Sequence, residues 1–168
     1  VVMPATPYDA KGLMISSIED NNPVIFLEHR WLHTVTGNVP EGEYRVPIGK
    51  GNISRSGSDI TIISFSYMVI EALYAAKILA SLGIEAEVID LRSVRPLDVN
   101  LILESVKKTG NLLVVEQAWK TVSISGEIIA LASEEVFEFL KASPVRLTLP
   151  DIPSPSTPGL TKFYHPRA

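Results

Sequence analysis

The chain has 168 residues, 46% of them hydrophobic, which is enough apolar material for one complete domain and part of a neighbour. The formal net charge of -4 gives no basic surface of the kind that binds nucleic acid or an anionic membrane. The absence of cysteine excludes disulfides, thiolate catalysis and thiolate metal sites, and because it fits a reducing compartment we expect a cytoplasmic protein.

The first third of the chain is predicted to contain a helix, a strand and a linker. The helix covers residues 9–18, with Thr6 as its cap and Pro7 in its first turn. Residues 23–28 ("PVIFLE") are a short apolar run, which is typical of a strand covered on both faces. Residues 29–57 carry scattered glycine, proline and charge, which indicates an interdomain linker.

Beyond the linker, strands and helices alternate regularly. The predicted strands are residues 60–65, 85–91, 112–116 and 145–149, and the predicted helices are residues 69–82, 99–108 and 124–140. Asp98 is expected to cap the second of these helices, and Gly83 to end the first. The proline-rich stretch at 150–159 continues no element. This order predicts an α/β fold, a mostly parallel sheet with helices on both faces.

In such sheets ligands bind at the carboxyl ends of the strands. The side chains that the pattern places there are Ser64, Ser66, Arg92, Arg95, Glu116 to Trp119, and Asp151. Neither a G-x-G-x-x-G nor a G-x-x-x-x-G-K-[ST] phosphate loop occurs. The loop-to-helix segment "SISGE" at 123–127 either binds an anion or only caps its helix, and capping is favoured.

The strand-end residues each have a structural alternative to a catalytic role. Ser64 and Ser66 lack the surrounding G-x-S-x-G pattern of a nucleophile, so a strand-end or capping role is favoured. Glu116 is either an active-site carboxylate or the ion-pair partner of Arg92 or Lys120. Position in the sequence does not separate these two readings.

The three histidines are a second set of candidates. His29, His33 and His165 lie in the linker and the tail, and no H-E-x-x-H spacing occurs. His29 and His33 would share a face if their stretch is helical, but surface histidines are favoured over a metal site.

Four stretches together resemble one known family. They are "ATPYDAKGLMISSIEDNNPVIFLEHRWLH", "YRVPIGKGNISRSGSDITIISFSYMVIEAL", "GIEAEVIDLRSVRPLDVNLILESVKKTGNLLVVEQAW" and "SPVRLTLPDIPSPSTPGLTKFYHP". They are similar to the beta subunit of the thiamine-diphosphate-dependent decarboxylating component of 2-oxo acid dehydrogenase complexes. The resemblance covers essentially the whole chain. Members of this family act on pyruvate, branched-chain 2-oxo acids or acetoin.

The resemblance implies two parts. Residues 1–48 would be the end of a pyrimidine-binding domain plus a linker, and residues 49–168 a transketolase-like C-terminal domain. The family's catalytic glutamate and histidine lie upstream of Val1, and thiamine diphosphate and Mg²⁺ are bound mainly outside this segment. We therefore assign no catalytic or cofactor-binding residue to this chain, and we expect it to be a fragment that is inactive alone.

The function that the resemblance implies belongs to an assembled heterotetramer. That enzyme oxidatively decarboxylates a 2-oxo acid and transfers the acyl group to a lipoyl group. The expected partners are an alpha subunit, a second beta subunit and the lipoyl acyltransferase core, and this segment would serve assembly and docking. The alternatives are a stand-alone interaction module of the same fold, and the C-terminal domain of a transketolase or a deoxyxylulose-phosphate synthase.

Two sets of site residues follow from the resemblance. The segment "SSIEDNN" resembles a loop that binds a structural potassium ion, which would place the ion at Ser17, Ile18, Asp20 and Asn22. Helix-end carbonyls and a carboxylate suit such a cation, whereas the alternative is an ordinary helix-ending turn.

Arg92 and Arg95 are assigned to the partner interface. Of the two, Arg92 is expected to fasten its loop, and Arg95 to reach a partner. One departure concerns the loop after the third predicted strand. The family's glycine-rich stretch is replaced by Ser123, Ile124 and Ser125, with only Gly126 kept, which changes how closely that loop can approach a neighbour.

Overall fold

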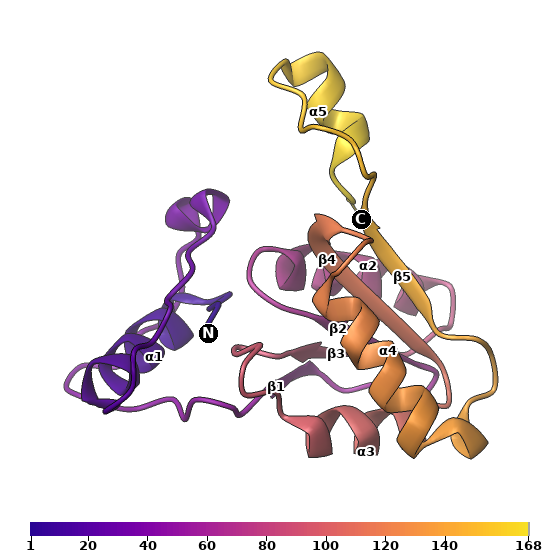
Figure 1. Ribbon diagram of the computed structural model, residues 1–168, viewed down its shortest axis with the longest axis horizontal. Coiled ribbons are helices and arrows are strands. Elements are labelled where there is room, and N and C mark those ends of the chain that lie inside the picture. The colour runs from indigo at the N-terminus through magenta and orange to yellow at the C-terminus, as the bar shows by residue number, and fades with distance from the viewer. Residues whose placement is uncertain (168) are drawn as a thin grey trace.

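The computed structural model describes residues 1–167, and a five-stranded sheet organises the larger part of them (Figure 1). The strand order is β1-β3-β2-β4-β5. β1 (Asn52–Arg55) runs antiparallel to β3 (Ala86–Asp90), whereas β2 (Ile60–Ser64), β4 (Leu112–Trp119) and β5 (Val145–Leu149) continue the sheet in parallel. The predicted fold class is confirmed. β1 was not predicted, because a short edge strand in a glycine-rich stretch shows little apolar alternation.

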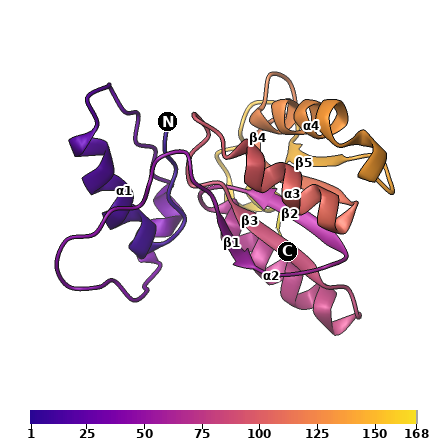
Figure 2. The same cartoon turned by 90° about the horizontal axis from the view of Figure 1, so that it is seen from below.

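Helices cover both faces of the sheet (Figure 2). α2 (Met68–Ser81) lies on one face, while α3 (Val99–Thr109) and α4 (Ile124–Glu135) pack together on the other. As predicted, Asp98 caps α3 by accepting a hydrogen bond from the backbone N of Leu101.

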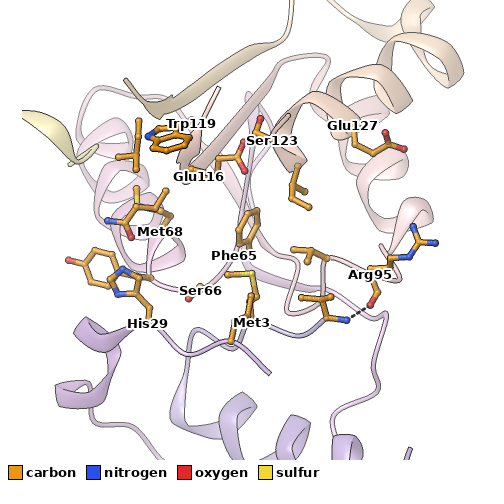
Figure 3. Close-up of a pocket in the computed structure, with 18 of the residues that line it drawn as sticks. Met3, His29, Phe65, Ser66, Met68, Arg95, Glu116, Trp119, Ser123 and Glu127 are labelled. Carbon is orange, nitrogen blue, oxygen red and sulfur yellow. Dashed lines mark hydrogen bonds between the residues drawn. The ribbon is translucent and has the colours of Figure 1, made fainter. Parts of the chain in front are cut away.

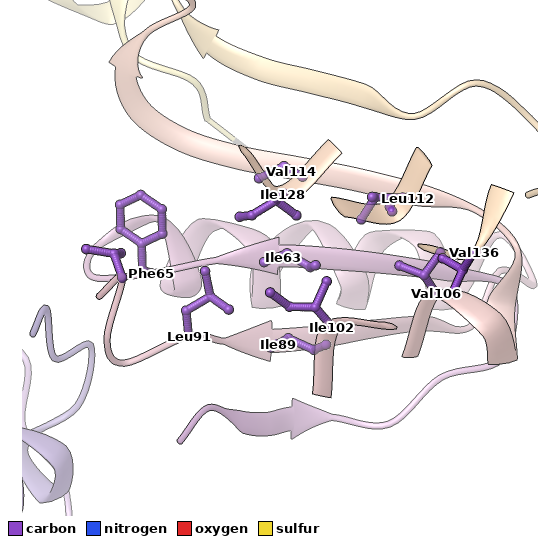
Figure 4. Packing of buried hydrophobic residues seen from close by; sticks show 12 residues of the cluster. Ile63, Phe65, Ile89, Leu91, Ile102, Val106, Leu112, Val114, Ile128 and Val136 are labelled. Atoms are coloured by element: carbon purple, nitrogen blue, oxygen red, sulfur yellow. The ribbon is translucent and has the colours of Figure 1, made fainter. Parts of the chain in front are cut away.

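The alternation of side chains along the strands explains these two layers. Ile62 on β2 pairs in register with Val88 on β3, and both belong to the cluster under α2. Their neighbours Ile63 and Ile89 face the opposite cluster, under α3 and α4 (Figure 4). Because successive residues of a strand point to opposite faces, continuous apolar strands bury both faces of the sheet.

The N-terminal segment forms a small body beside the sheet (Figure 1). It contains α1 (Pro7–Glu19) and a 3-10 helix, η1 (Arg30–Thr34). Thr6 caps α1, since its side chain accepts a hydrogen bond from Asp9 N at 3.0 Å. The prediction of a covered strand at 23–28 is wrong. Within residues 1–167, this stretch makes only an isolated bridge between Phe26 and Val2, and no second strand shields its outer face.

Two other differences lie near the C-terminus. The helix predicted at 124–140 ends at Glu135, because Val136 (φ -140°, ψ 27°) leaves the helical region, and a 3-10 turn, η2 (Phe137–Phe139), follows. After the proline-rich stretch comes an unpredicted short helix, α5 (Pro158–Tyr164), whose Pro158 suits a first turn. None of the helices within residues 1–167 has the length and apolarity needed to cross a membrane.

A glycine outside the helices and strands is expected to be essential for the sheet. A Cβ atom added at Gly57 would press on the backbone of Glu85, Ala86 and Glu87 more closely than real Cβ atoms approach. Because this backbone enters β3, Gly57→Ala should lower the free energy of unfolding by roughly 1–3 kcal/mol or more. Gly159→Ala, which meets nothing within 4 Å and lies in α5, is the control and should not lower the free energy of unfolding. Urea denaturation of both variants measures this, and equal losses would contradict the prediction.

Candidate functional site

A cleft with a volume of about 1560 Å³ opens at the carboxyl ends of the parallel strands (Figure 3). It is lined by the residues that follow β2, β3 and β4, by the N-terminal segment and by the end of α5. β2 and β4 are neighbours, but the chain leaves β2 through α2 on one face and β4 through α4 on the other. The cleft therefore lies at the topological switch point, where ligands of open α/β sheets bind.

Glu116, at the inner part of this cleft, is 0% exposed. Its Oε1 accepts a hydrogen bond from Ser125 N at 3.1 Å, so this carboxylate occupies the N-terminus of α4. Its Oε2 is buried without a partner. Among residues 1–167, Glu116 forms no ion pair with Arg92 or Lys120, which rules out the ion-pair reading. In the "SISGE" segment the N-cap residue Ser123 makes no side-chain capping hydrogen bond, so Glu116 and not the segment itself caps α4.

The two serines after β2 have different surroundings. Ser64 Oγ donates a hydrogen bond to the carbonyl of Val115 at 2.9 Å, which ties β2 to β4 and leaves no free nucleophile there. Ser66 is 5% exposed, has a positive φ of 54° and carries a buried Oγ without a partner. Ser66 therefore lines the cleft with an unused hydroxyl group.

Aromatic rings form one wall of the cleft. His29 stacks on Tyr67 with ring centroids 5.1 Å apart, and Trp31 contacts both Tyr67 and His165 edge to face. Burial lowers the pKa of His29 and of His165. The two histidines contact the same ring, Trp31, only through tertiary packing, so the sequence could not place them together.

The C-terminal segment is fastened to this wall. Arg167 lies over the Trp31 ring at 4.5 Å and donates a hydrogen bond to Tyr67 Oη at 2.6 Å. Trp119 Nε1 donates to Tyr164 Oη at 3.0 Å. His33 lies apart from this cluster, near Glu28. Within the described part of the chain, no group of three His, Cys, Asp or Glu side chains is placed to hold a metal ion.

Arg92 and Arg95 have separate surroundings. Arg92 Nη2 lies 2.7 Å from Asp9 Oδ1, and the two side chains are only 15% and 4% exposed. This ion pair joins the loop after β3 to α1, although the two atoms are not aligned as a hydrogen bond. The assignment of Arg92 to a partner interface stays a prediction. Arg95 is exposed and lines the cleft, so its side chain is accessible to a partner.

Asp90, at the end of β3, lies next to this ion pair. Its Oδ1 accepts a hydrogen bond from the backbone N of Arg92 at 2.9 Å. Burial raises the pKa of Asp90 to about 7, despite this hydrogen bond. The contact between α1 and the loop after β3 therefore contains two buried carboxyl groups, those of Asp9 and Asp90, beside the guanidinium group of Arg92.

The residues considered for potassium lie at the end of α1. Asn22 donates from its backbone N and its Nδ2 to Asp20 Oδ1, at 2.8 and 2.9 Å. These hydrogen bonds lower the pKa of Asp20. Ser17 Oγ donates to Leu13 O at 2.6 Å, and Ile18 is exposed. The local geometry is that of a helix-ending turn with an ionised, exposed carboxylate.

Taken together, these contacts show how the polar side chains at the strand ends are used within the described residues. Glu116 caps a helix, Ser64 bonds to the backbone, and Ser66 has no hydrogen-bonded base. What the cleft offers is a buried acceptor, a hydroxyl group and aromatic surface.

Residues 49–168 match the family model described as "Transketolase, C-terminal domain". A solved structure titled "Split gene transketolase, inactive beta4 tetramer" superimposes with a TM-score of 0.81 at 28% identity, over 97% of this chain and 52% of that one.

Curated relatives match over nearly the whole chain. The acetoin:2,6-dichlorophenolindophenol oxidoreductase subunit beta of Cupriavidus necator is 47% identical over 100% of this chain and 50% of the relative. The pyruvate dehydrogenase E1 component subunit beta of Bacillus subtilis is 47% identical over 90% and 47%. The 2-oxoisovalerate dehydrogenase subunit beta of Bacillus subtilis is 45% identical over 98% and 51%. The chain thus spans about half the length of these relatives.

Proposed function

We infer the function from the premise that this chain belongs to the family of transketolase C-terminal domains. We propose that it is the C-terminal half of the beta subunit of a thiamine-diphosphate-dependent 2-oxo acid dehydrogenase. In that enzyme it would support assembly with an alpha subunit and a second beta subunit, and docking to the lipoyl acyltransferase core. The carrying observation is the 47% identity over the full chain to a dehydrogenase-type beta subunit.

The N-terminal segment supports this proposal. The similarity to that beta subunit includes residues 1–48, which lie outside the matched domain. The Asp9–Arg92 ion pair joins this segment to the sheet in the same chain. We therefore propose that residues 1–48 are the end of a pyrimidine-binding domain, held against the C-terminal domain of residues 49–168.

The cofactors belong to the proposed whole enzyme. Thiamine diphosphate, bound with Mg²⁺, supplies the decarboxylation chemistry of this class. The residues of this chain would position the subunits around it, and Arg95, exposed at the mouth of the cleft, would contact a partner subunit.

The 168-residue chain with thiamine diphosphate, Mg²⁺ and pyruvate should give no turnover, and clear turnover would show that this division of roles is wrong.

A chimera tests the proposal directly. This chain would replace the matching half of the Cupriavidus necator beta subunit, which would be co-expressed with its own alpha subunit. We expect the chimera to co-purify with that subunit and to retain acetoin-dependent reduction of dichlorophenolindophenol. The same chimera with Arg95→Glu is the interface variant, and it should co-purify less well. A folded chimera that never assembles would contradict the proposal.

We also propose that potassium binds at the end of α1, through carbonyl groups and the charge of Asp20. The residues present fit a cation, because Asp20 is exposed and its pKa is lowered by Asn22. At ten times the dissociation constant, KCl should then stabilise the chain by about 1.4 kcal/mol relative to NaCl of equal concentration. Urea denaturation in the two salts measures this. Asp20→Ala should abolish the difference, and an equal effect of both salts on the unaltered chain would refute the site.

A second candidate function is a stand-alone, self-associating module. The neighbour titled as an inactive beta4 tetramer favours it, since that title describes a beta chain assembled without activity. Exposed apolar residues on α2, Tyr74 and Ile78, and Leu82 directly after it would suit such association. The gene separates the two candidates: an upstream pyrimidine domain and a neighbouring alpha-like reading frame favour the dehydrogenase. A clean monomer in light scattering would count against self-association.

A further inference from the structure

The cleft between the ends of β2 and β4 contains buried hydrogen-bonding groups that the described chain does not use. Glu116 Oε1 is bonded to Ser125 N, but Glu116 Oε2 has no partner. Ser66 Oγ, from the neighbouring strand end, has none either. Gln117 Oε1, in the residue after Glu116, is a third buried atom of this cleft without a partner. Buried polar atoms are normally paired, so three such atoms in one cleft indicate groups that are completed by a ligand.

The charge of this site points to a cation. Within residues 1–167, none of the ion pairs involves Glu116. A carboxylate away from water is costly unless it is paired, and the N-terminus of α4 satisfies only one of its oxygens. The same carboxylate repels anions from that helix end. Arg95 also lines the cleft, but its side chain is exposed to water, whereas Glu116 is fully buried. A ligand that donates hydrogen bonds and carries positive charge therefore fits the surroundings of Glu116 best.

The walls of the cleft point to a flat ligand. Phe65 and Trp119 line it, and Figure 3 shows Phe65 between Glu116 and Ser66. Trp31 also lines the cleft, but Arg167 already lies over its ring. Aromatic faces stack on planar rings and attract cations. The aromatic walls and the unpaired carboxylate thus both favour a ligand that carries positive charge.

We propose that this cleft binds a planar aromatic small molecule bearing a cationic N–H donor, such as an amidinium or a protonated amine. Glu116 Oε2 accepts its hydrogen bond, and Ser66 Oγ offers a second contact. This site goes beyond the proposed role in assembly, because it gives the domain a small-molecule ligand of its own. It does not depend on whether the chain belongs to a dehydrogenase.

Two probes of the same ring and opposite charge test the proposal. Benzamidine and benzoate would each be titrated into the ¹⁵N-labelled 168-residue chain and followed by NMR. We expect benzamidine to give saturable shifts at the Ser125 amide and the Trp119 indole, and benzoate to give none at these positions. Equal binding of the two probes, preference for benzoate, or no saturable shift with benzamidine would each overturn the proposal.

Variants locate the site. Glu116→Gln keeps an acceptor for Ser125 N but removes the charge, so it should weaken benzamidine binding at least tenfold, which is about 1.4 kcal/mol. Glu127→Gln is the matched control, since Glu127 lines the same cleft with an exposed side chain, and it should change affinity less than about twofold. Equal effects of the two variants would refute the role of Glu116. If circular dichroism shows that Glu116→Gln is unfolded, the comparison of the two probes on the unaltered chain still decides.

Discussion

Replacement of Arg92 by alanine is expected to lower the free energy of unfolding by about 3–5 kcal/mol. Arg92 Nη2 lies 2.7 Å from Asp9 Oδ1, and both side chains are largely buried. Removal of the guanidinium group leaves the carboxylate of Asp9 without its cation in a place that water barely reaches. Because the pair joins α1 to the loop after β3, α1 should also open more often, while the backbone hydrogen bonds of Val1 and Met3 to that loop remain. Urea denaturation measures the first effect, and hydrogen exchange of the α1 amides measures the second.

Arg95→Ala is the matched control for this prediction. Arg95 lies in the same loop, but its side chain is exposed, so its loss should change the stability of the isolated chain by less than about 0.5 kcal/mol. The double variant Asp9→Asn with Arg92→Ala should recover part of the loss, since it no longer buries an unpaired charge. If Arg92→Ala were no more harmful than Arg95→Ala, the ion pair would not hold the two parts together.

Asp90→Asn is expected to remove a large part of the pH dependence of stability. Burial raises the pKa of Asp90 from 3.8 to about 7. In the unfolded chain this carboxyl ionises near pH 4, whereas in the folded chain it stays protonated until about pH 7. Its contribution to stability is therefore fully present below about pH 4 and is lost as the pH rises to about 7, a change of about 4 kcal/mol.

The asparagine variant is a close match in shape. Its side-chain oxygen can still accept the hydrogen bond from Arg92 N, but it does not ionise. From pH 4 to pH 8, the unaltered chain should lose about 4 kcal/mol of stability relative to this variant. Asp151→Asn, at an exposed carboxylate, serves as the control. Urea denaturation at several pH values gives the comparison, and parallel pH profiles for the unaltered chain and Asp90→Asn would refute a raised pKa.

The sequence predicted helix caps and strands correctly where their physical cause lies within a few neighbouring residues. The caps at Thr6 and Asp98 were predicted, because a side chain that accepts a hydrogen bond from the backbone N two or three residues ahead leaves a short-range pattern. β2 and β3 were predicted from apolar runs that any two-sided burial requires. The same rule predicted a covered strand at 23–28, and this prediction is wrong, because an apolar run does not reveal whether a second strand exists to cover it.

The sequence by itself determined the order of the main strands and helices, the α/β class and the resemblance to dehydrogenase beta subunits. Only the tertiary structure decided which polar groups meet. It paired Arg92 with Asp9, placed Glu116 on the N-terminus of α4, and brought His29 and His165 to one wall of a cleft. The physical reason is that helix and strand formation depends on neighbours within a few residues, whereas ion pairs and clefts join groups that are distant in sequence. Their partners are fixed by how the layers pack, and one sequence carries no separate record of that packing.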